Sequence, residues 1–172
     1  MTDRLETPRL VLRKARDEDL EGIFINVWQD ERLAETMLWT PTATLEDARA
    51  RLARTKDYQK RYDAFFVCLK ETNEPVGFAG VREIAPGEYD ETGICVCRKE
   101  QHKGLGGEVL DALIGLTFEK RGGHTFYYSC FRGNAASAAL CKSRGFVYLD
   151  SYEQTRERDG RTFLCDRYVL KK

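Results

Sequence analysis

The chain has 172 residues and carries 28 Lys and Arg against 28 Asp and Glu, so its formal net charge is zero. This length suits one domain with a substantial core, and we expect residues 1–172 to form a single domain. Balanced charge argues against bulk nucleic-acid binding, and no apolar run approaches the length of a membrane span. The charged start lacks a signal-peptide core, so we expect a cytoplasmic protein without nucleic-acid or membrane partners.

The six cysteines are scattered along the chain without a Cys-x-x-Cys pair, and only two histidines are present. Four of the cysteines stand inside apolar runs, which is typical of small core residues in a reducing compartment. Too few histidines remain to complete a zinc site with them. We therefore expect no metal.

The first part of the chain predicts a short strand followed by two helices. Residues 10–12 alternate with arginines as a strand, and Asp17 is placed to cap a helix that runs to about residue 29. Thr44 predicts the start of a second helix, with Asp47 as its capping partner. The charged stretch that follows, from 49 to 61, is expected to be a solvated helix face.

The rest of the chain predicts strands punctuated by Gly, Pro and Asn turns, with two further helices. The expected strands are 64–70, 76–84, 89–97, 125–130, 147–155 and 162–170, and the helices begin after 107 and at 134. The order predicts an α/β (mixed α+β) fold: a twisted, mostly antiparallel sheet of about seven strands with about four helices. Only the helix-linked strands are expected to be parallel.

A glycine-rich segment, 101–107, stands between an apolar strand pattern and a helix pattern. Its glycines allow the backbone to approach a ligand closely, and the first amides of a helix have no partner within the helix. With the helix dipole and the charge of Lys103, the segment predicts a phosphate or pyrophosphate site. The Walker and dinucleotide motifs are absent, because Glu108 and Val109 follow Gly107. A tight turn without any ligand is the alternative.

Three motifs occur in register over residues 7 to about 150. They are Thr7-Pro8-Arg9-Leu10-Val11-Leu12-Arg13; Gln101, Gly104 and Gly106; and Asn134, Ser137 and Leu140 followed by Gly145-Phe146. With the element order, they make the chain resemble the GNAT superfamily of N-acetyltransferases. Within it, the branch that acetylates ribosomal-protein N-termini is the most similar.

The resemblance implies that acetyl-CoA is the cosubstrate. Its pyrophosphate would lie on the amides of 102–107, and its pantetheine would pair with the strand that ends at residue 97. Asn134 would position the acceptor or the pantetheine, or would simply cap its helix. The expected cofactor-binding residues are Cys95, Val96, Cys97, Gln101, His102, Lys103, Gly104, Leu105, Gly106, Gly107, Asn134 and Ser137.

The resemblance also implies the catalytic groups. Glu91, in the sequence Glu91-Thr92-Gly93, matches a Glu-Ile-Gly strand of the family and would act as the base, unless it is only an exposed strand carboxylate. The amide of Val96 would stabilise the oxyanion. Cys141 stands where many members have Tyr, so its thiol would protonate the leaving thiolate, or it is a small buried residue.

The acceptor side is expected at the first helices and their loop, with Trp28 and above all Trp39 at its wall. The predicted activity is transfer of acetyl from acetyl-CoA to a primary amine, a protein N-terminus or a small molecule, by direct attack on the thioester. A non-catalytic acyl-CoA-binding sensor or interaction domain is the alternative. A monomer and a homodimer are both open.

Overall fold

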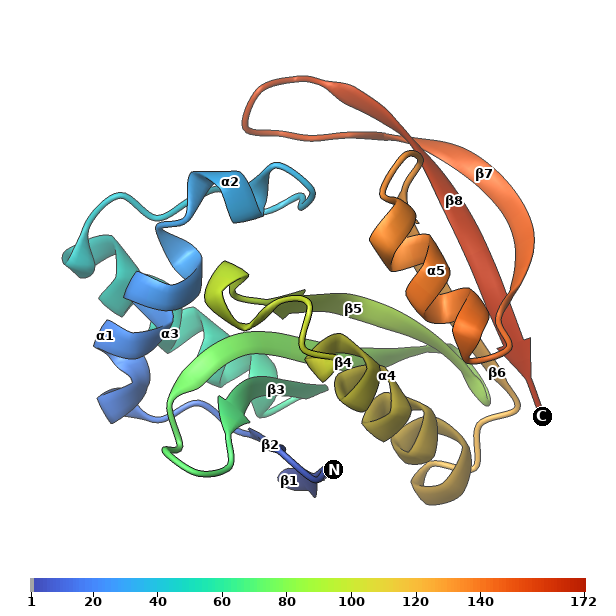
Figure 1. Ribbon diagram of the computed structural model, residues 1–172, viewed down its shortest axis with the longest axis horizontal. Coiled ribbons are helices and arrows are strands. Elements are labelled where there is room, and N and C mark those ends of the chain that lie inside the picture. Colours follow the sequence, from blue (N-terminus) through green and yellow to red (C-terminus); the bar gives the residue numbers. More distant parts are fainter. Residues whose placement is uncertain (1) are drawn as a thin grey trace.

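The structure, a computed structural model that describes residues 2–172, is built on one open eight-stranded sheet in the order β1-β2-β3-β4-β5-β6-β8-β7 (Figure 1). The strands are β1 Arg4–Glu6, β2 Leu10–Arg13, β3 Asp63–Leu69, β4 Pro75–Ala85, β5 Glu88–Val96, β6 Thr125–Phe131, β7 Val147–Thr155 and β8 Thr162–Lys171. Every neighbouring pair is antiparallel except β5 with β6. The predicted fold class is confirmed, with β1 as one strand more than expected.

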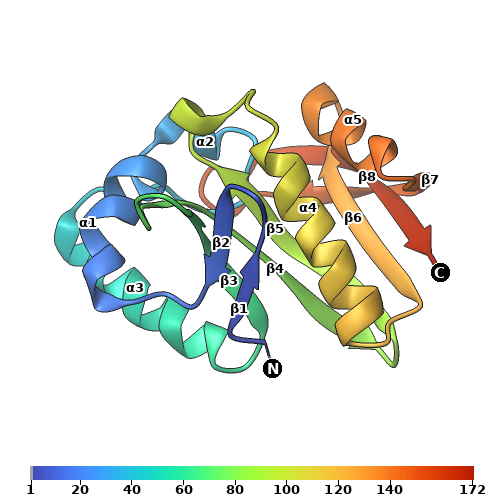
Figure 2. The same ribbon diagram turned by 60° about the horizontal axis from the view of Figure 1, so that its bottom comes forward.

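Helices cover both faces of this sheet, with α3 and α4 on opposite faces (Figure 2). The helices are α1 Leu20–Ile23, α2 Glu31–Ala34, α3 Leu45–Gln59, α4 Leu105–Gly115 and α5 Ala135–Ser143. A 3-10 turn precedes α1, and π-helical turns follow α1 and α4. The short helix α2 was not predicted. Along residues 2–172, no helix is both long and apolar enough to cross a membrane.

The start of the first helical segment differs from the prediction. Asp19, not Asp17, accepts the hydrogen bond of the cap amide, from Arg16 at 2.7 Å. Asp19 also forms a two-pronged ion pair with Arg13, both bonds 2.8 Å long, and each side chain is only 3% exposed. Asp17 lies on the surface beside Lys56. The predicted cap at Thr44 is confirmed, because its hydroxyl accepts from the Asp47 amide at 3.1 Å.

We expect Asp19→Ala to lower the free energy of unfolding by about 3–5 kcal/mol, because the Arg13 guanidinium would be left buried without its counter-charge. For a chain of this size that corresponds to a melting temperature lower by roughly 10 °C. Thermal unfolding measures it. Asp17→Ala, in the same turn but on the surface, is the control and should change stability by less than about 1 kcal/mol. Equal effects of the two substitutions would contradict the assignment.

The parallel strands β5 and β6 separate part of the way along their length. They pair only from Glu88 to Asp90 of β5, opposite residues 125–127 of β6. Beyond Asp90, β5 keeps its antiparallel partner β4 but no longer pairs with β6. The second half of β5 therefore has an open edge, which is where a further extended chain can pair.

The turn between β7 and β8 reaches across the molecule to the segment after α2, and Figure 1 shows this hairpin arching above α2. Arg156, buried near the turn, donates to the carbonyls of Glu35 at 3.0 Å and Met37 at 3.3 Å. Asp159 forms an ion pair with the same guanidinium at 2.6 Å. The hairpin thus fixes the backbone of the loop between α2 and α3.

Candidate active site

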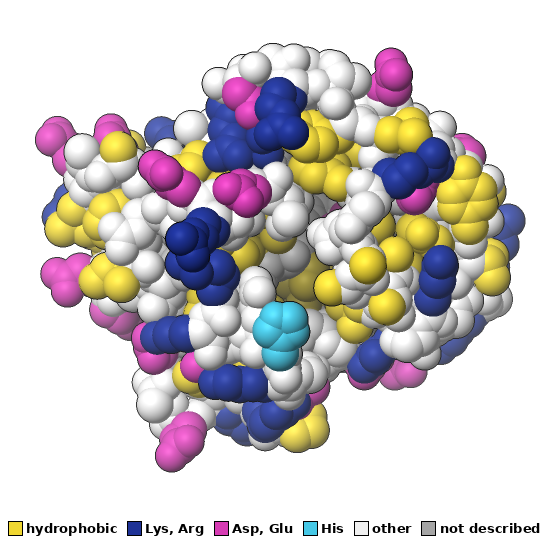
Figure 3. All heavy atoms as spheres, turned by 45° about the horizontal axis from the view of Figure 1, so that its top comes forward, with side chains coloured by type: hydrophobic (Ala, Val, Ile, Leu, Met, Phe, Trp, Pro, Cys, Tyr) yellow, Lys and Arg dark blue, Asp and Glu magenta, His cyan; other side chains and the backbone are white. Residues whose placement is uncertain are grey.

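A cavity of about 490 Å³ opens between the separated strands β5 and β6, and Figure 3 shows a hollow with hydrophobic side chains inside it. Its walls come from β5, the glycine-rich loop with the first turn of α4, β6, α5 and the segment after α2. The residues that line it include Thr36, Met37, Glu91, Gly93, Ile94, Val96, Gln101, His102, Gly104, Leu105, Gly106, Gly107, Tyr128, Ser129, Cys130, Asn134, Ser137 and Leu140.

The glycine-rich loop brings the start of α4 to this cavity. Gly104 is the N-cap residue of α4 and has a φ of 80°, a left-handed conformation that glycine adopts without strain. His102 also has a positive φ, 61°, so the chain turns sharply twice before the helix. Gly106 and Gly107 then line the cavity in the first turn, where helix amides have no partner within the helix. The arrangement suits an anionic group.

Residues of the N-terminal motif hold this helix start in place. The carboxylate of Glu108 accepts hydrogen bonds from the Thr7 hydroxyl and from the backbone and side chain of Arg9. Burial alone would raise the pKa of Glu108, but the hydrogen bonds from Thr7 and Arg9 outweigh it and lower the pKa. Glu108 therefore stays ionised and ties β2 to α4. Thr7 and Arg9 thus position the start of α4 and do not themselves line the cavity.

The open edge of β5 carries the backbone groups of Val96. The amide of the next residue, Cys97, donates to the Val76 carbonyl of β4, whereas the Val96 carbonyl accepts from the Gln101 side chain at 2.9 Å. Because backbone groups of successive strand residues point to opposite edges, the Val96 amide faces the open side. Gln101 thereby fastens the loop to the strand.

Glu91 lies where β5 and β6 begin to separate, and its carboxylate accepts from the Gly93 amide. Burial raises the pKa of Glu91 to about 7, and the neighbouring Asp90 adds to this rise. The amides of Gly93 and Ser129 act in the opposite direction without cancelling the effect. A carboxyl group with this pKa can accept a proton near neutral pH.

A hydroxyl pair lines the cavity close to Glu91. The Tyr128 hydroxyl and the Ser137 Oγ atom are 2.7 Å apart, on β6 and α5 respectively. Burial raises the pKa of Tyr128, with the charge of Glu91 as a further cause. Asn134 both caps α5, by accepting from the Ser137 amide at 3.2 Å, and lines the cavity. Its two proposed roles are compatible.

Several residues singled out from the sequence do not line this cavity. The Cys141 thiol is buried in the core and donates to the Ala138 carbonyl at 3.3 Å, and burial raises its pKa to about 11. Lys103 points to another part of the surface and pairs with Glu100 at 2.9 Å. The others outside the lining are the core residues Cys95, Cys97 and Trp28, together with Trp39, which lines a second cavity. For Cys141 and Lys103 the helix or loop geometry turns the side chain away.

The sequence interpretation missed the contribution of β6. Parallel pairing continues to Asp90 opposite Tyr127, so the next residues, Glu91 and Tyr128, mark the point of separation. The strand itself was predicted, and the polar side chains of Tyr128, Ser129 and Cys130 at its end could have indicated that it contributes to the site. Cys130 also lines the cavity. Across residues 2–172 there is no group of three or more His, Cys, Asp or Glu side chains able to hold a metal ion.

A family model described as acetyltransferase (GNAT) domain matches residues 9–147. A GNAT-family acetyltransferase from Bacillus anthracis is 18% identical with a TM-score of 0.83, over 98% of each chain. A Vibrio cholerae protein described as a ribosomal-protein-serine acetyltransferase is 21% identical with a TM-score of 0.81, over 98% of this chain and 97% of that one. RimL, a ribosomal L7/L12 acetyltransferase solved with coenzyme A, is 19% identical with a TM-score of 0.81, over 98% of each chain. These structures share the fold, and no curated protein sequence matches the chain.

Proposed function

The chain belongs to the GNAT acetyltransferase family, and on this premise we propose that it transfers the acetyl group of acetyl-CoA to a primary amine. Family membership makes it an acetyl-CoA-dependent acetyltransferase. The observation that carries the amine proposal is Glu91, a carboxyl group with a pKa of about 7 in the cavity beside the open edge of β5. A primary amine is mostly protonated at neutral pH and needs such a base before it can attack.

Acetyl-CoA supplies an activated thioester. The loop amides up to Gly107 would hold its pyrophosphate, and the open edge of β5 would pair with its amide-bearing arm. The site fits this ligand because it offers unpaired helix amides and a free strand edge in one cavity. The Val96 amide, which faces the same side, would donate to the thioester oxygen as negative charge develops there.

Glu91 takes one proton of the protonated amine, directly or through water, which frees the nitrogen lone pair. The nitrogen forms its bond to the acetyl carbon as the bond from that carbon to sulfur breaks, and coenzyme A leaves as a thiolate. The Tyr128 and Ser137 hydroxyls, 2.7 Å apart in the cavity, give a proton to this sulfur and are restored by the second proton that the nitrogen loses as the amide forms. This pair replaces Cys141 in the proposed mechanism, since the Cys141 thiol does not reach the cavity.

The test measures release of coenzyme A thiol over a panel of amines: peptides with free N-termini, polyamines and aminoglycosides. We expect turnover with at least one class, and mass spectrometry should find the acetyl group on its amine. Binding of acetyl-CoA without turnover on any amine would favour the non-catalytic sensor. Absence of acetyl-CoA binding would contradict the cofactor site itself.

A further inference from the structure

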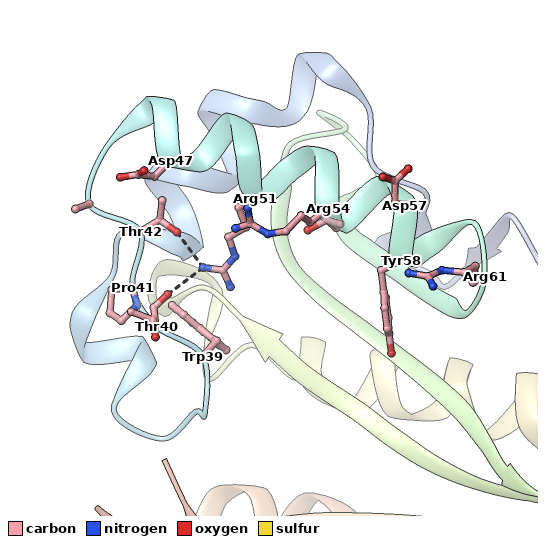
Figure 4. A pocket seen from close by; sticks show the side chains of 12 residues that line it. Trp39, Thr40, Pro41, Thr42, Asp47, Arg51, Arg54, Asp57, Tyr58 and Arg61 are labelled. Atoms are coloured by element: carbon pink, nitrogen blue, oxygen red, sulfur yellow. Dashed lines mark hydrogen bonds between the residues drawn. The ribbon is translucent and has the colours of Figure 1, made fainter. Parts of the chain in front are cut away.

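A second cavity, of about 900 Å³, lies between α3 and the loop that precedes it. Figure 4 shows that Arg51, Arg54 and Tyr58 of α3 line it opposite Trp39 of the loop. Arg61, in the turn just after the end of α3, lines it too. No part of the mechanism above uses this cavity.

The lining of the cavity carries an excess of positive charge. Within the described part of the chain, residues 2–172, none of its three arginines forms an ion pair with a carboxylate. Of its two acidic residues, Asp57 pairs with Lys60 at 2.8 Å, and Asp47 accepts from the neutral Thr44 hydroxyl and keeps its charge, so three arginines outweigh one free carboxylate. Guanidinium groups arranged in this way match carboxylates or phosphates.

Arg51 shows that this charge is held in place. Its guanidinium lies between the rings of Trp28 and Trp39, 4.7 and 5.0 Å from their centres. It donates to the Thr40 carbonyl at 3.2 Å and the Thr42 hydroxyl at 3.0 Å (Figure 4). Burial, with the nearby charge of Arg54, lowers the pKa of Arg51 to about 10, so a bound anion would relieve its environment. The buried Trp39 Nε1 atom also has no hydrogen-bond partner.

The same loop borders both cavities. Thr36 and Met37 line the first cavity, and Trp39 lines the second. The Trp39 ring packs edge-on against Phe78 with 6.4 Å between ring centres. Phe78 in turn lies close to Gly93, whose amide hydrogen-bonds the Glu91 carboxylate. Trp39, Phe78 and Gly93 thus form a continuous series of contacts from the second cavity to Glu91, and this is the route that an acceptor held in both cavities would follow.

The spacing of the arginines selects the kind of anion. Arg51 and Arg54 lie on α3, and Arg61 follows just after its last residue, Gln59; the helix from Arg51 to Gln59 alone spans roughly 12 Å. A single phosphate is too compact to meet all three guanidiniums, whereas an extended peptide covers about 12 Å with about four residues. Several carboxylates carried on such a peptide fit the row.

We propose that this cavity binds acidic side chains of a peptide acceptor, so that the preferred substrate is an N-terminus followed by Asp or Glu within about its first five residues. The proposal rests on the proposed function, because it assigns the acceptor of the same reaction. The arginines would strengthen binding of the peptide whose amine reaches Glu91. They would not take part in the chemical step.

The experiment compares two peptides with the same N-terminal Ala, one continuing Asp-Glu-Asp-Glu and one continuing Asn-Gln-Asn-Gln. In the wild type the acidic peptide should have the lower KM. In the double variant Arg54→Gln/Arg61→Gln we expect its KM to rise at least about 10-fold, with kcat and the KM of the amide peptide nearly unchanged. Arg49→Gln, on the same helix but outside this cavity, is the matched control. Equal KM values for the two peptides in the wild type would overturn the proposal.

A binding measurement separates this proposal from the proposed function. The only two tryptophans, Trp28 and Trp39, both contact Arg51, so their fluorescence reports on the cavity without turnover. The N-acetylated acidic peptide should change it saturably in the wild type, and much less in the double variant. This result without any acetyl transfer would support the anion site while contradicting the proposed function. No change with this peptide, or an equal change with the amide peptide, would reject the anion site.

Discussion

Replacing Glu91 by Gln should lower kcat/KM for the amine acceptor by about 10²–10⁴-fold, the contribution of a positioned general base. The Gln side chain keeps the shape of Glu and cannot take the proton. Acetyl-CoA binding should change little, because the expected pyrophosphate contacts lie on the loop and α4. Steady-state kinetics with a direct acetyl-CoA titration separates the two effects.

The pH dependence gives the same prediction a second test. With its pKa raised to about 7 by burial and by Asp90, Glu91 is protonated and inactive as a base below pH 7. Activity should therefore rise with pH through about 7 and level off above it. The amine also titrates, but its contribution is common to both proteins. The ratio of wild-type to Glu91→Gln activity should thus isolate the carboxyl.

Folding of this variant can be checked independently. A carboxyl whose pKa is raised in the folded state favours folding in its protonated form, and this contribution is lost as pH rises through the folded pKa. Glu91→Gln should consequently be at least as stable as the wild type at pH 8. An inactive variant that is also unfolded would say nothing about catalysis. A folded variant with a ratio independent of pH would contradict the assignment of the base.

Local patterns predicted most of the fold. The strand at 147–155 was predicted at its observed bounds, and the cap at Thr44 was found, because periodicity and capping depend on neighbours in sequence. β1 and α2 span only three and four residues, too few for a periodic signal. The sequence alone does not distinguish Asp17 from Asp19 as the capping residue. The buried ion pair of Asp19 with Arg13 selects Asp19, and that contact belongs to the tertiary structure.

Those parts of the site that depend on the position of the backbone could be predicted. The glycine loop, the open edge of β5 and the position of Glu91 follow from motif and strand order. Side-chain direction did not follow: Lys103 and Cys141 stand at the expected positions but point elsewhere. The charged stretch around Arg51 was likewise interpreted as a solvated helix face. Its contacts with Trp28 and Trp39 could not be predicted, because the fold brings both rings to Arg51 from other segments of the chain.

The second large effect is expected from Gly106→Asp, which should weaken acetyl-CoA binding by about 100-fold or more. Gly106 lies in the first turn of α4 and lines the cavity, so a carboxylate there faces the expected pyrophosphate. Like charges in contact cost several kcal/mol, and each 1.4 kcal/mol is tenfold in affinity. Isothermal titration with acetyl-CoA measures the change.

Charge and shape can be separated at this position, because Gly106→Asn has the size of Asp without its charge. A Cβ atom at Gly106 would be 3.5 Å from the nearest atom, Leu140 Cδ2, an ordinary contact. Asn should therefore weaken binding by less than about tenfold. Asp should leave the fold intact or stabilise it by up to about 1 kcal/mol, since an acidic side chain suits a helix N-terminus. A stable Asp variant that binds poorly, beside an Asn variant that binds well, identifies the helix start as the anion site. An equal loss of acetyl-CoA affinity in both variants would mean that the site has no room for a side chain at Gly106, whatever its charge.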